Sequence, residues 1–551
     1  MAGGVPGPPV AGLPDWTALL ETSRSLWEDA RRRATGPEVL IATSVAGFSA
    51  LTTVESLLAV CLTLRGARVH TLLCDAVLPA CLRAEMPEVP DPRTIADDRL
   101  RSVLCPQCTA TGEYVYAPLR LPGHTFGGLL TAGEREQARR LAASLPLPAI
   151  PTYRRGAVSI GEHAHAGALR YFASGNLGDE PYGEAVLRRY FEAALLAADA
   201  TERLLRQRPF VAACFNHGIY APQGVVGEVC RAAATRVINW NVAYRKRCFI
   251  FSEGDTYHHT LLSEPSAAWE DMTWTPAMEQ EILEYLRSRW NGTRDWIWFH
   301  EKPDEAFDEH ARTLGLDRSR PIVGMLTNVM WDAQLHYRAN AFPDMLTWAV
   351  HTIRYFAGRT DLQLLIRVHP AEIRGTMRSR QPILAELGKV FPTLPPNVFV
   401  IPPESPVSTY AAMAACDAVI IYGTKTGVEL TSLGIPVIVG GEAWIRNKGL
   451  THDATTPAQY VEILDRLPFG RRSDPDTVTR ARKYAYHFFF RRMIPVRCMT
   501  PVSGWPPYRI TVDGLEDLLP GRDPGLDVIC DGILSGSPFV FEAEKHGVGE
   551  S

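Results

Sequence analysis

Five short apolar runs between residues 321 and 440 constrain the fold of this chain more than any other feature. Each run is rich in Val, Ile and Leu, and stretches long enough for a helix separate them. Continuous short apolar runs are typical of parallel strands that are buried on both faces. The runs are residues 321–326, 362–368, 398–401, 418–422 and 436–440. We therefore predict a parallel sheet covered by helices, a Rossmann-like domain, over residues 317–470.

The N-terminal half of the chain contains two similar strand–helix–strand units. The first consists of an apolar run at residues 38–43, a helical stretch at 53–65 closed by Gly66, and a second run at 68–74. The second unit consists of residues 210–215, 223–234 and 236–240. Such units build parallel sheets, because the helix returns the chain to the same edge before the next strand. We predict a second Rossmann-like domain over residues 36–263, with an insertion between its units.

Three further segments complete the predicted organisation. Residues 1–35 form an N-terminal extension and helix, residues 264–316 a helical connector rich in Trp, and residues 471–551 a crossing helix and tail. The predicted fold class is α/β, with two doubly wound domains facing each other across a cleft.

Composition excludes several classes of protein. The 57 basic residues nearly balance the 61 acidic ones, so the net charge of -4 gives no reason to expect nucleic acid as a partner. The longest apolar runs are much shorter than the roughly 20 residues that span a bilayer, which predicts no transmembrane segment. Eleven cysteines in 551 residues do not form a disulfide framework. The start of the chain lacks the pattern of a secretory signal, and we expect a cytoplasmic protein.

The segment from Tyr422 to Glu429 is the most informative loop of the domain predicted over residues 317–470. Gly423 and Gly427 allow close approach of the backbone to a ligand, and Thr424 and Thr426 add hydroxyl donors around Lys425. A phosphate or diphosphate suits such a strand-to-helix turn, and Glu429 lies where a carboxylate could accept ribose hydroxyls. The alternative is a Gly-containing turn with a capping Thr and no ligand.

Two other loops of this block carry polar residues after a strand. Asn328 and Asp332 follow the first strand, and Arg367 and His369 end the second. Pro370 fixes the exit of the chain, so the His369 imidazole can project over the strand end toward a phosphate. The alternative is a strand-end histidine bonded to a neighbouring loop.

Three segments of this predicted domain together resemble the C-terminal half of bacterial capsule polysaccharide biosynthesis glycosyltransferases, the group that includes Kdo transferases. The resemblance rests on residues 365–370, 416–430 and 434–439 and covers about residues 321–464. It implies a GT-B fold and a nucleotide-activated sugar as donor. By this similarity His369, Thr424 and Thr426 would contact the donor phosphate and Glu429 the ribose. Lys425 departs from the small and hydroxyl residues common in that loop.

The implied function is transfer of a sugar from a nucleotide-sugar donor to a carbohydrate or other hydroxyl acceptor, in surface polysaccharide or glycoconjugate biosynthesis. We expect no metal requirement for the chemistry, because His369 and Lys425 can offset the charge of the leaving phosphate. The donor-binding residues expected on this basis are Asn328, Arg367, His369, Gly423, Thr424, Lys425, Thr426, Gly427 and Glu429. The alternatives are a sugar-nucleotide epimerase, a polyol-phosphate transferase, and a non-catalytic nucleotide-binding scaffold of a polysaccharide assembly complex.

Glycosyl transfer also needs a base for the acceptor hydroxyl. His217 is the first candidate, because it follows a buried strand of the N-terminal domain and precedes a helix. Asp332, and Glu162 with its neighbour His163, are the alternatives. The basic residues 245–247 could steer an anionic substrate or simply form a solvated face.

Four cysteines suggest a metal site in the N-terminal half. Cys105 and Cys108 form a C-x-x-C pair shortly after Cys74 and Cys81, and two such pairs can supply four thiolates to a structural zinc ion. The alternative is a buried Cys74 with a reduced or redox-active Cys105–Cys108 pair.

Overall fold

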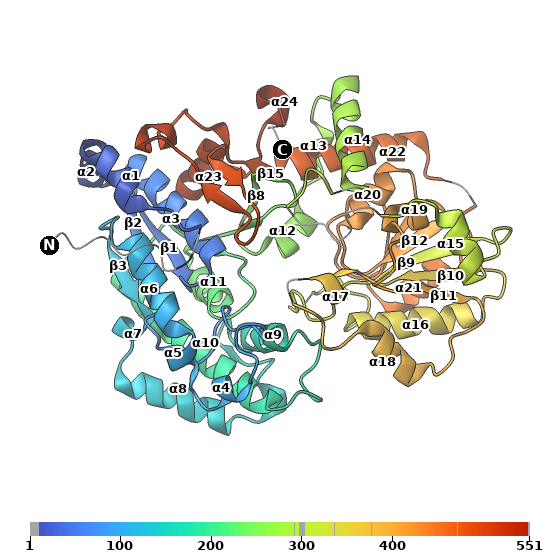
Figure 1. Cartoon of the computed structure of the whole chain (residues 1–551), viewed down its shortest axis with the longest axis horizontal. Coiled ribbons are helices and arrows are strands. Elements are labelled where there is room, and N and C mark those ends of the chain that lie inside the picture. The colour runs from blue at the N-terminus through green and yellow to red at the C-terminus, as the bar shows by residue number, and fades with distance from the viewer. Residues whose placement is uncertain are drawn as a thin grey trace.

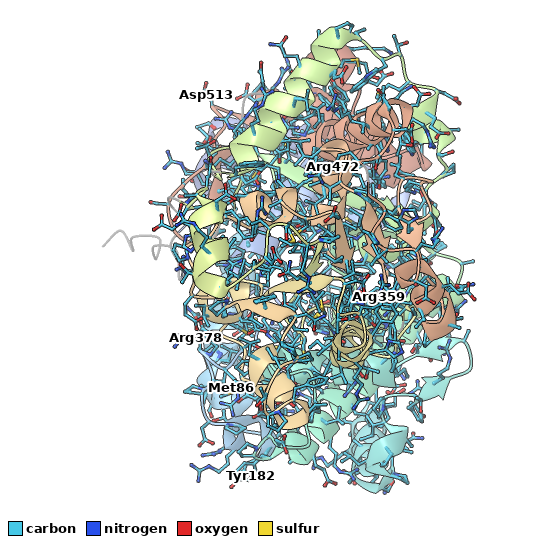
Figure 2. The ribbon with its side chains drawn as sticks, turned by 90° about the vertical axis from the view of Figure 1, so that its right-hand side faces the viewer. Met86, Tyr182, Arg359, Arg378, Arg472 and Asp513 are labelled. Carbon is cyan, nitrogen blue, oxygen red and sulfur yellow. The ribbon has the colours of Figure 1, made fainter. Side chains whose placement is uncertain are left out.

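The computed structural model describes residues 10, 12–290, 292–296, 303–335, 337–375, 377–470 and 472–548. Two sheet-centred domains lie side by side, and the connector and the C-terminal segment cross above them in the view of Figure 1. Turned by 90°, Asp513 lies near the upper end of the molecule and Met86 and Tyr182 near the lower end (Figure 2). Residues 1–9 and 11 of the predicted N-terminal extension lie outside the described residues.

The N-domain is built on a seven-stranded sheet in the order β15-β8-β7-β6-β1-β2-β3. Its strands are β1 (Glu38–Ser44), β2 (Arg68–Leu73), β3 (Gly123–Thr125), β6 (Ala212–Asn216), β7 (Arg236–Val242), β8 (Cys248–Glu253) and β15 (Met493–Pro495). The first five in chain order run parallel, whereas β8 and β15 are antiparallel to their neighbours. The four strands predicted in this half are β1, β2, β6 and β7.

The C-domain is built on a six-stranded, fully parallel sheet in the order β11-β10-β9-β12-β13-β14. Its strands are β9 (Ile322–Leu326), β10 (Gln363–Arg367), β11 (Val398–Ile401), β12 (Ala418–Ile421), β13 (Val437–Val439) and β14 (His452–Asp453). All five strands predicted in this block are present, and the two-residue β14 was not predicted. The two sheets confirm the predicted fold class of two Rossmann-like domains.

Helices cover both sheets. The N-domain contains α1 (Trp16–Thr22), α2 (Arg24–Arg33), α3 (Ser49–Leu64), α4 (Arg93–Ala96), α5 (Leu100–Val103), α6 (Cys105–Tyr116), α7 (Phe126–Leu129), α8 (Ala132–Ser144), η1 (Leu147–Ala149), the hairpin β4 (Arg154–Arg155) and β5 (Val158–Ser159), α9 (Gly161–Phe172), α10 (Gly183–Gln207) and α11 (Gln223–Ala232). The connector contains α12 (Tyr257–Ser263), α13 (Ala267–Glu270) and α14 (Pro276–Trp290). The C-domain contains α15 (Phe307–Leu314), α16 (Met345–Ala357), α17 (Ala371–Arg374), α18 (Ile383–Val390), α19 (Thr409–Ala414), α20 (Thr426–Ser432) and α21 (Pro457–Leu464). Among the described residues, no helix is both long and apolar enough to cross a bilayer.

The C-terminal segment returns from the C-domain to the N-domain. It contains α22 (Pro475–Tyr486), the π-helical turn η2 (His487–Arg491), β15, the hairpin β16 (Met499–Pro501) and β17 (Tyr508–Ile510), η3 (Leu515–Leu518), α23 (Pro524–Ser535) and α24 (Ala543–His546). Helix α22 packs against α20 and α14, and β15 then pairs with β8. Arg492 and His487 hold the buried carboxylate of Glu264, at 2.5 Å and 3.2 Å. The segment therefore completes the N-domain sheet.

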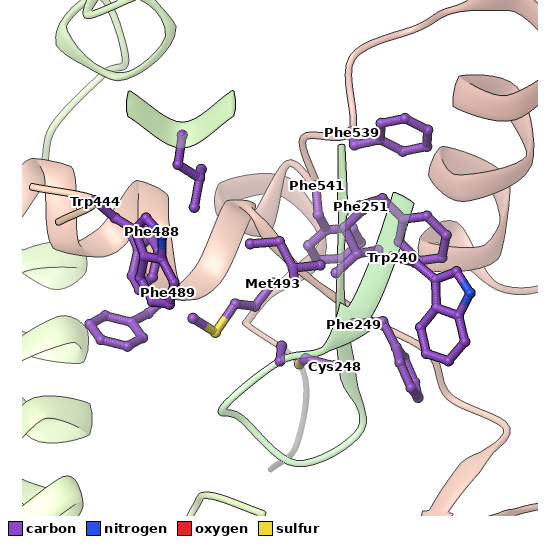
Figure 3. Packing of buried hydrophobic residues seen from close by; sticks show 14 of the residues in the cluster. Trp240, Cys248, Phe249, Phe251, Trp444, Phe488, Phe489, Met493, Phe539 and Phe541 are labelled. Carbon is purple, nitrogen blue, oxygen red and sulfur yellow. The ribbon is translucent and has the colours of Figure 1, made fainter. Parts of the chain in front are cut away.

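Aromatic side chains from three parts of the chain form one buried cluster. Figure 3 shows Trp240, Phe249 and Phe251 of the N-domain beside Phe539 and Phe541, and Trp444 of the C-domain beside Phe488 and Phe489. Each of these rings is less than a tenth exposed. Burial of such large apolar surfaces stabilises the fold by about 25 cal/mol per Å². Both domains and the C-terminal segment therefore share a hydrophobic core.

The basic residues 245–247 lie in the turn between β7 and β8. Arg245 is buried there, which fits neither an exposed group that steers an anionic substrate nor a solvated face. Its side chain is 1% exposed, lies over the Phe490 ring at 4.6 Å, and donates to the carbonyl oxygens of Phe489 (3.1 Å) and Val548. Arg245 thus joins the N-domain to the C-terminal segment.

Glu55 of α3 lies fully buried beneath the carboxyl ends of β6 and β7. Its Oε1 accepts hydrogen bonds from the Asn216 backbone N–H (2.8 Å) and from Trp240 Nε1 (2.9 Å). Burial nevertheless raises its pKa to about 7, because desolvation outweighs these bonds.

The raised pKa of Glu55 predicts a pH-dependent stability. Because the pKa of Glu55 is higher in the folded state than in the unfolded state, protonated Glu55 stabilises the folded state. This stabilisation is complete below the unfolded-state pKa and is lost as pH rises through about 7. We expect the free energy of unfolding of the wild type to fall by about 2.5 kcal/mol relative to Glu55→Gln between pH 5 and pH 8. Urea titrations of both proteins across this range measure the difference. A difference that does not change with pH would contradict the assignment.

Candidate functional site

Each sheet has a switch point where the strand order reverses direction. In the N-domain it lies between β1 and β6, and in the C-domain between β9 and β12. Connections on the two sides of a switch point leave in opposite directions, which opens a crevice at the carboxyl ends of the strands. The loops at these points are residues 45–48 and 217–222 in the N-domain, and residues 327–332 and 422–425 in the C-domain. Two of the three loops predicted to bind the donor therefore flank one crevice.

Asn328 joins the two loops of the C-domain crevice. Its side-chain Nδ2 donates to the Gly423 carbonyl at 2.5 Å, and its backbone N–H donates to Met345 Sδ at 3.2 Å. Across this junction, the hydroxyls of Thr424 and Thr426 lie 3.2 Å apart. Both hydroxyls are half-buried on one turn, so they can act together on a single group.

His369 lies beside this crevice at the end of β10 and is half-buried. Its backbone N–H donates to Thr327 Oγ1 at 3.2 Å, and its Nδ1 accepts from the Ala371 N–H at 3.0 Å. Because Nδ1 is an acceptor, the ring proton lies on Nε2. The local backbone thus prepares a neutral imidazole that donates from Nε2.

Glu429 and Lys425 belong to a buried ion network. Glu429 Oε1 lies 3.0 Å from Arg289 Nε and 3.2 Å from Lys425 Nζ, and Arg289 also pairs with Asp295. Lys425 Nζ lies 4.7 Å from the centre of the Tyr244 ring. Although burial works to raise it, the two cations lower the pKa of Glu429. The carboxylate predicted to bind ribose is thus already neutralised by two protein cations.

Arg289 was not predicted from the sequence. It lies in the connector helix α14, 140 residues before Glu429. The surrounding sequence reads as an ordinary charged helix, and only the fold brings the two together. Gly427 lies nearby with its Cα facing Ile421 and Ile445, and a Cβ there would come within 2.9 Å of both side chains, which explains the glycine.

Arg367 is buried under the crevice. Its guanidinium donates to the carbonyl oxygens of Pro402 (2.6 Å) and Ser405 (3.3 Å), and burial lowers its pKa to about 10. These contacts order the loop that follows β11. Through these contacts Arg367 supports the crevice, and its predicted contact with the donor stays a prediction.

His217 lies at the carboxyl end of β6, on the N-domain side. Its backbone is left-handed (φ 63°), a conformation that is uncommon for residues other than glycine. Residues held in such strained conformations cluster at functional sites. Burial, with a smaller contribution from Arg170, lowers its pKa to about 3. The ring is therefore neutral at pH 7, and it lies 5.2 Å from the Tyr220 ring and 5.8 Å from His258.

Tyr220 connects the two crevices. Its hydroxyl donates to Asp332 Oδ1 at 2.9 Å and accepts from the Ala333 backbone N–H at 3.0 Å. Asp332 is exposed, and Ala333 has a left-handed backbone (φ 51°). Two of the predicted base candidates, His217 and Asp332, are thus brought to the same tyrosine from opposite domains.

His258 and Tyr257 of the connector helix α12 extend this cluster. Their rings lie 5.6 Å and 5.3 Å from Trp444 of the C-domain, and burial lowers the pKa of His258 to about 3. Neither residue was predicted, because α12 carries no motif that distinguishes it from other short helices.

The remaining base candidates support the N-domain side. His163 is buried and donates from Nδ1 to the Ile219 carbonyl at 2.5 Å, which holds the loop that carries His217. Glu162 lies in the first turn of α9, where it accepts from Ser159 Oγ at 3.2 Å.

The four cysteines of the predicted zinc site surround one small cavity of about 10 Å³. Cys108 Sγ accepts from the Gly47 N–H at 3.0 Å, and burial raises the pKa of Cys74 to about 12 and that of Cys105 to about 11. The remaining member of the set, Cys81, is also a free thiol. Among the described residues, no group of three or more Cys, His, Asp or Glu side chains is arranged to hold a metal ion, so the structure gives the zinc prediction no support.

A larger cavity lies away from the switch points. It has a volume of about 710 Å³ at the edge strand β14 and is lined by Arg446, Asn447, Thr451, His452, Asp453, Thr455, Gln459, Glu462, Ile463 and Arg466. None of the predicted site residues lines it. Cavity size alone therefore does not identify the candidate site in this protein.

Comparison with known proteins does not assign the chain to a family. No family model matches the sequence, and no curated protein matches it. Solved structures with some likeness include a β-Kdo 2,4-transferase, KpsC of Thermosulfurimonas dismutans (13% identity, 50% of this chain and 79% of that chain, TM-score 0.35). Others are the calicheamicin glycosyltransferase CalG4 (12%, 82% and 94%, 0.24) and the UDP-GlcNAc 2-epimerase of Neisseria meningitidis bound to UDP-GlcNAc (10%, 81% and 94%, 0.25). These scores are too low to support an argument, and the fold class rests on the two sheets described above.

The hydrogen bonds of Tyr220 to Asp332 and Ala333 should stabilise the contact between the two domains. Tyr220→Phe removes the acceptor for the Ala333 N–H and the donor to Asp332, at a cost of about 1–3 kcal/mol. We expect hydrogen exchange at the Ala333 amide to accelerate by about tenfold or more. Tyr355→Phe is the matched control, because Tyr355 bonds Asp465 at 2.8 Å within the C-domain. Equal exchange at Ala333 in all three proteins would show that the Tyr220 contact does not hold the domains.

Proposed function

We propose that this protein is a glycosyltransferase that moves a sugar from a nucleotide-activated donor to a hydroxyl of a carbohydrate or other acceptor. The observation that carries the proposal is the meeting of two switch-point crevices through Tyr220 and Asp332. Two substrates bound at the carboxyl ends of the two sheets would meet at this junction. The motif resemblance over residues 321–464 supports a role in surface polysaccharide or glycoconjugate biosynthesis.

In this proposal the donor phosphates lie in the C-domain crevice. His369 donates from Nε2, and the hydroxyls of Thr424 and Thr426 donate from the facing turn. Asn328 holds the two loops at a fixed separation. Donors fixed before the reaction stabilise the negative charge that develops on the departing phosphate oxygen. Lys425 adds positive charge behind the same turn, although its ammonium is paired with Glu429.

The acceptor lies on the N-domain side, where His217 acts as the base. The acceptor oxygen attacks the anomeric carbon, its proton passes to the His217 imidazole, and the bond from the anomeric carbon to the phosphate oxygen breaks. The electron pair of that bond leaves with the phosphate. Burial keeps His217 unprotonated at neutral pH, and its pKa of about 3 makes it a weaker base than an exposed imidazole. Closure of the two domains around the substrates would exclude water, which would otherwise hydrolyse the donor.

Ligand-induced stabilisation tests the donor site. We expect one of UDP, CMP, GDP or TDP to raise the melting temperature of the wild type, since a ligand at 100 times its Kd stabilises by about 2.7 kcal/mol. His369→Ala should lose this stabilisation. His310→Ala is the control, because His310 is half-buried in α15, where it pairs with Asp304 at 2.7 Å. Stabilisation that survives unchanged in His369→Ala, or its absence with all four nucleotides, would count against the proposed donor site.

The pH dependence of turnover tests the base. With a His217 pKa of about 3, we expect kcat to show no loss from imidazole protonation between pH 5 and pH 8. His217→Ala should lower kcat by about 100-fold or more without changing nucleotide binding. If Asp332→Asn abolishes transfer and His217→Ala does not, the base is Asp332. Conversion of the donor sugar without any acceptor would instead indicate an epimerase.

A further inference from the structure

Trp505 is an unusual feature of the surface. Its side chain is 56% exposed, whereas Trp16, Trp240, Trp269 and Trp348 are at most 1% exposed. Among the described residues it is the only tryptophan in the group of exposed large hydrophobic side chains. Covering a tryptophan ring removes a large apolar surface from water, and tryptophan is enriched at interfaces.

The hairpin that carries Trp505 is anchored to the N-domain. Trp505 lies in the turn of the β16–β17 hairpin, which is closed by a hydrogen bond from the Val502 N–H to the Pro507 carbonyl at 2.9 Å. Tyr508, the first residue of β17, is fully buried, and its hydroxyl donates to the Ala50 carbonyl in α3 at 3.0 Å. Pro506 is buried beside the exposed ring. The exposure of Trp505 is therefore built into an anchored hairpin.

The hairpin places Trp505 at the N-domain crevice. The centres of the Trp505 and Phe48 rings lie 6.2 Å apart, with an angle of 88° between the ring planes. Phe48 ends the loop that follows β1 and caps α3 at the switch point. That loop is itself fixed, because Thr52 Oγ1 donates to the Ala46 carbonyl (2.7 Å) and Arg83 Nε to the Gly47 carbonyl (3.2 Å). Phe48 thus supports the indole ring in an edge-to-face arrangement, and more than half of the Trp505 side chain stays exposed.

We propose that Trp505, supported by Phe48, is a stacking subsite for a sugar ring of the acceptor glycan. This inference rests on the proposed function and specifies its acceptor as a carbohydrate with at least one ring outside the reacting unit. A sugar presents an apolar face of C–H groups that packs on an aromatic ring, while its hydroxyls stay in water. Exposed Ser503 and Gly504 flank the ring, so the apolar surface is small. One sugar ring suits this surface better than a protein partner or a membrane, which needs a larger patch.

Glycan binding by single variants tests the subsite. We expect the wild type to bind members of an array of bacterial capsular and lipopolysaccharide oligosaccharides, Trp505→Ala to bind them at least about tenfold more weakly, and Trp505→Phe to retain most of the affinity. Tyr182→Ala is the control, because Tyr182 is 51% exposed at the opposite end of the molecule from Asp513, which closely follows β17 (Figure 2). In transfer assays Trp505→Ala should raise the KM for the acceptor about tenfold with kcat and the nucleotide-induced stabilisation unchanged.

The outcomes separate this inference from the proposed function. Loss of glycan binding in Trp505→Ala without any nucleotide stabilisation in the wild type would keep the subsite and remove the transferase. Nucleotide stabilisation with equal glycan binding by the wild type and Trp505→Ala, or with no glycan bound by the wild type, would overturn the subsite alone. Binding to vesicles of anionic phospholipid that depends on Trp505, without glycan binding, would also overturn it.

Discussion

The rest of the structure depends on the buried ion network around Glu429. Buried charges are costly unless each one is paired, so Glu429, Lys425, Arg289 and Asp295 must hold their relative positions for the fold to be stable. These four residues come from the C-domain loop and from the end of the connector. Tyr244, from the turn after β7, packs against Lys425, and its carbonyl accepts from the Trp296 N–H at 2.9 Å. The network therefore fixes the C-domain crevice relative to the N-domain.

Because the orientation of the two domains is fixed, their two crevices lie together. Each Rossmann-like sheet opens a crevice at its own switch point, but neither crevice alone brings two substrates together. The Arg245 contacts to the C-terminal segment, the pairing of β15 with β8 and the Tyr220–Asp332 bond all hold the domains in one orientation. His217 and His369 thereby lie at the strand ends that bound the two crevices. The path of the chain, which leaves the N-domain and returns to it, is what makes this arrangement stable.

Local patterns made much of the fold predictable. Continuous apolar runs identified the strands of both switch points, and the Pro after His369 and the glycines around Lys425 identified the C-domain loops. What depended on distant partners was not predictable. Glu429 was expected to meet a ribose, yet its partner Arg289 is 140 residues away in a helix without a distinguishing motif. Tyr220, His258 and Trp505 likewise gain their positions only from tertiary contacts, and β3, β14 and β15 are too short to leave a periodic signal. The spacing of the four cysteines suggested a zinc site. The same spacing is equally compatible with four protonated thiols, and in the structure the pKa values of all four are raised.

A crystal structure with the stabilising nucleotide bound tests the central claim most directly. The account predicts the phosphates between the loops 327–332 and 422–425, with His369 Nε2 and the hydroxyls of Thr424 and Thr426 within hydrogen-bond distance of phosphate oxygens. The ion network around Glu429 should stay intact beneath them. A nucleotide found in the cavity beside β14, or elsewhere on the surface, would contradict the assignment of the donor site and with it the proposed reaction.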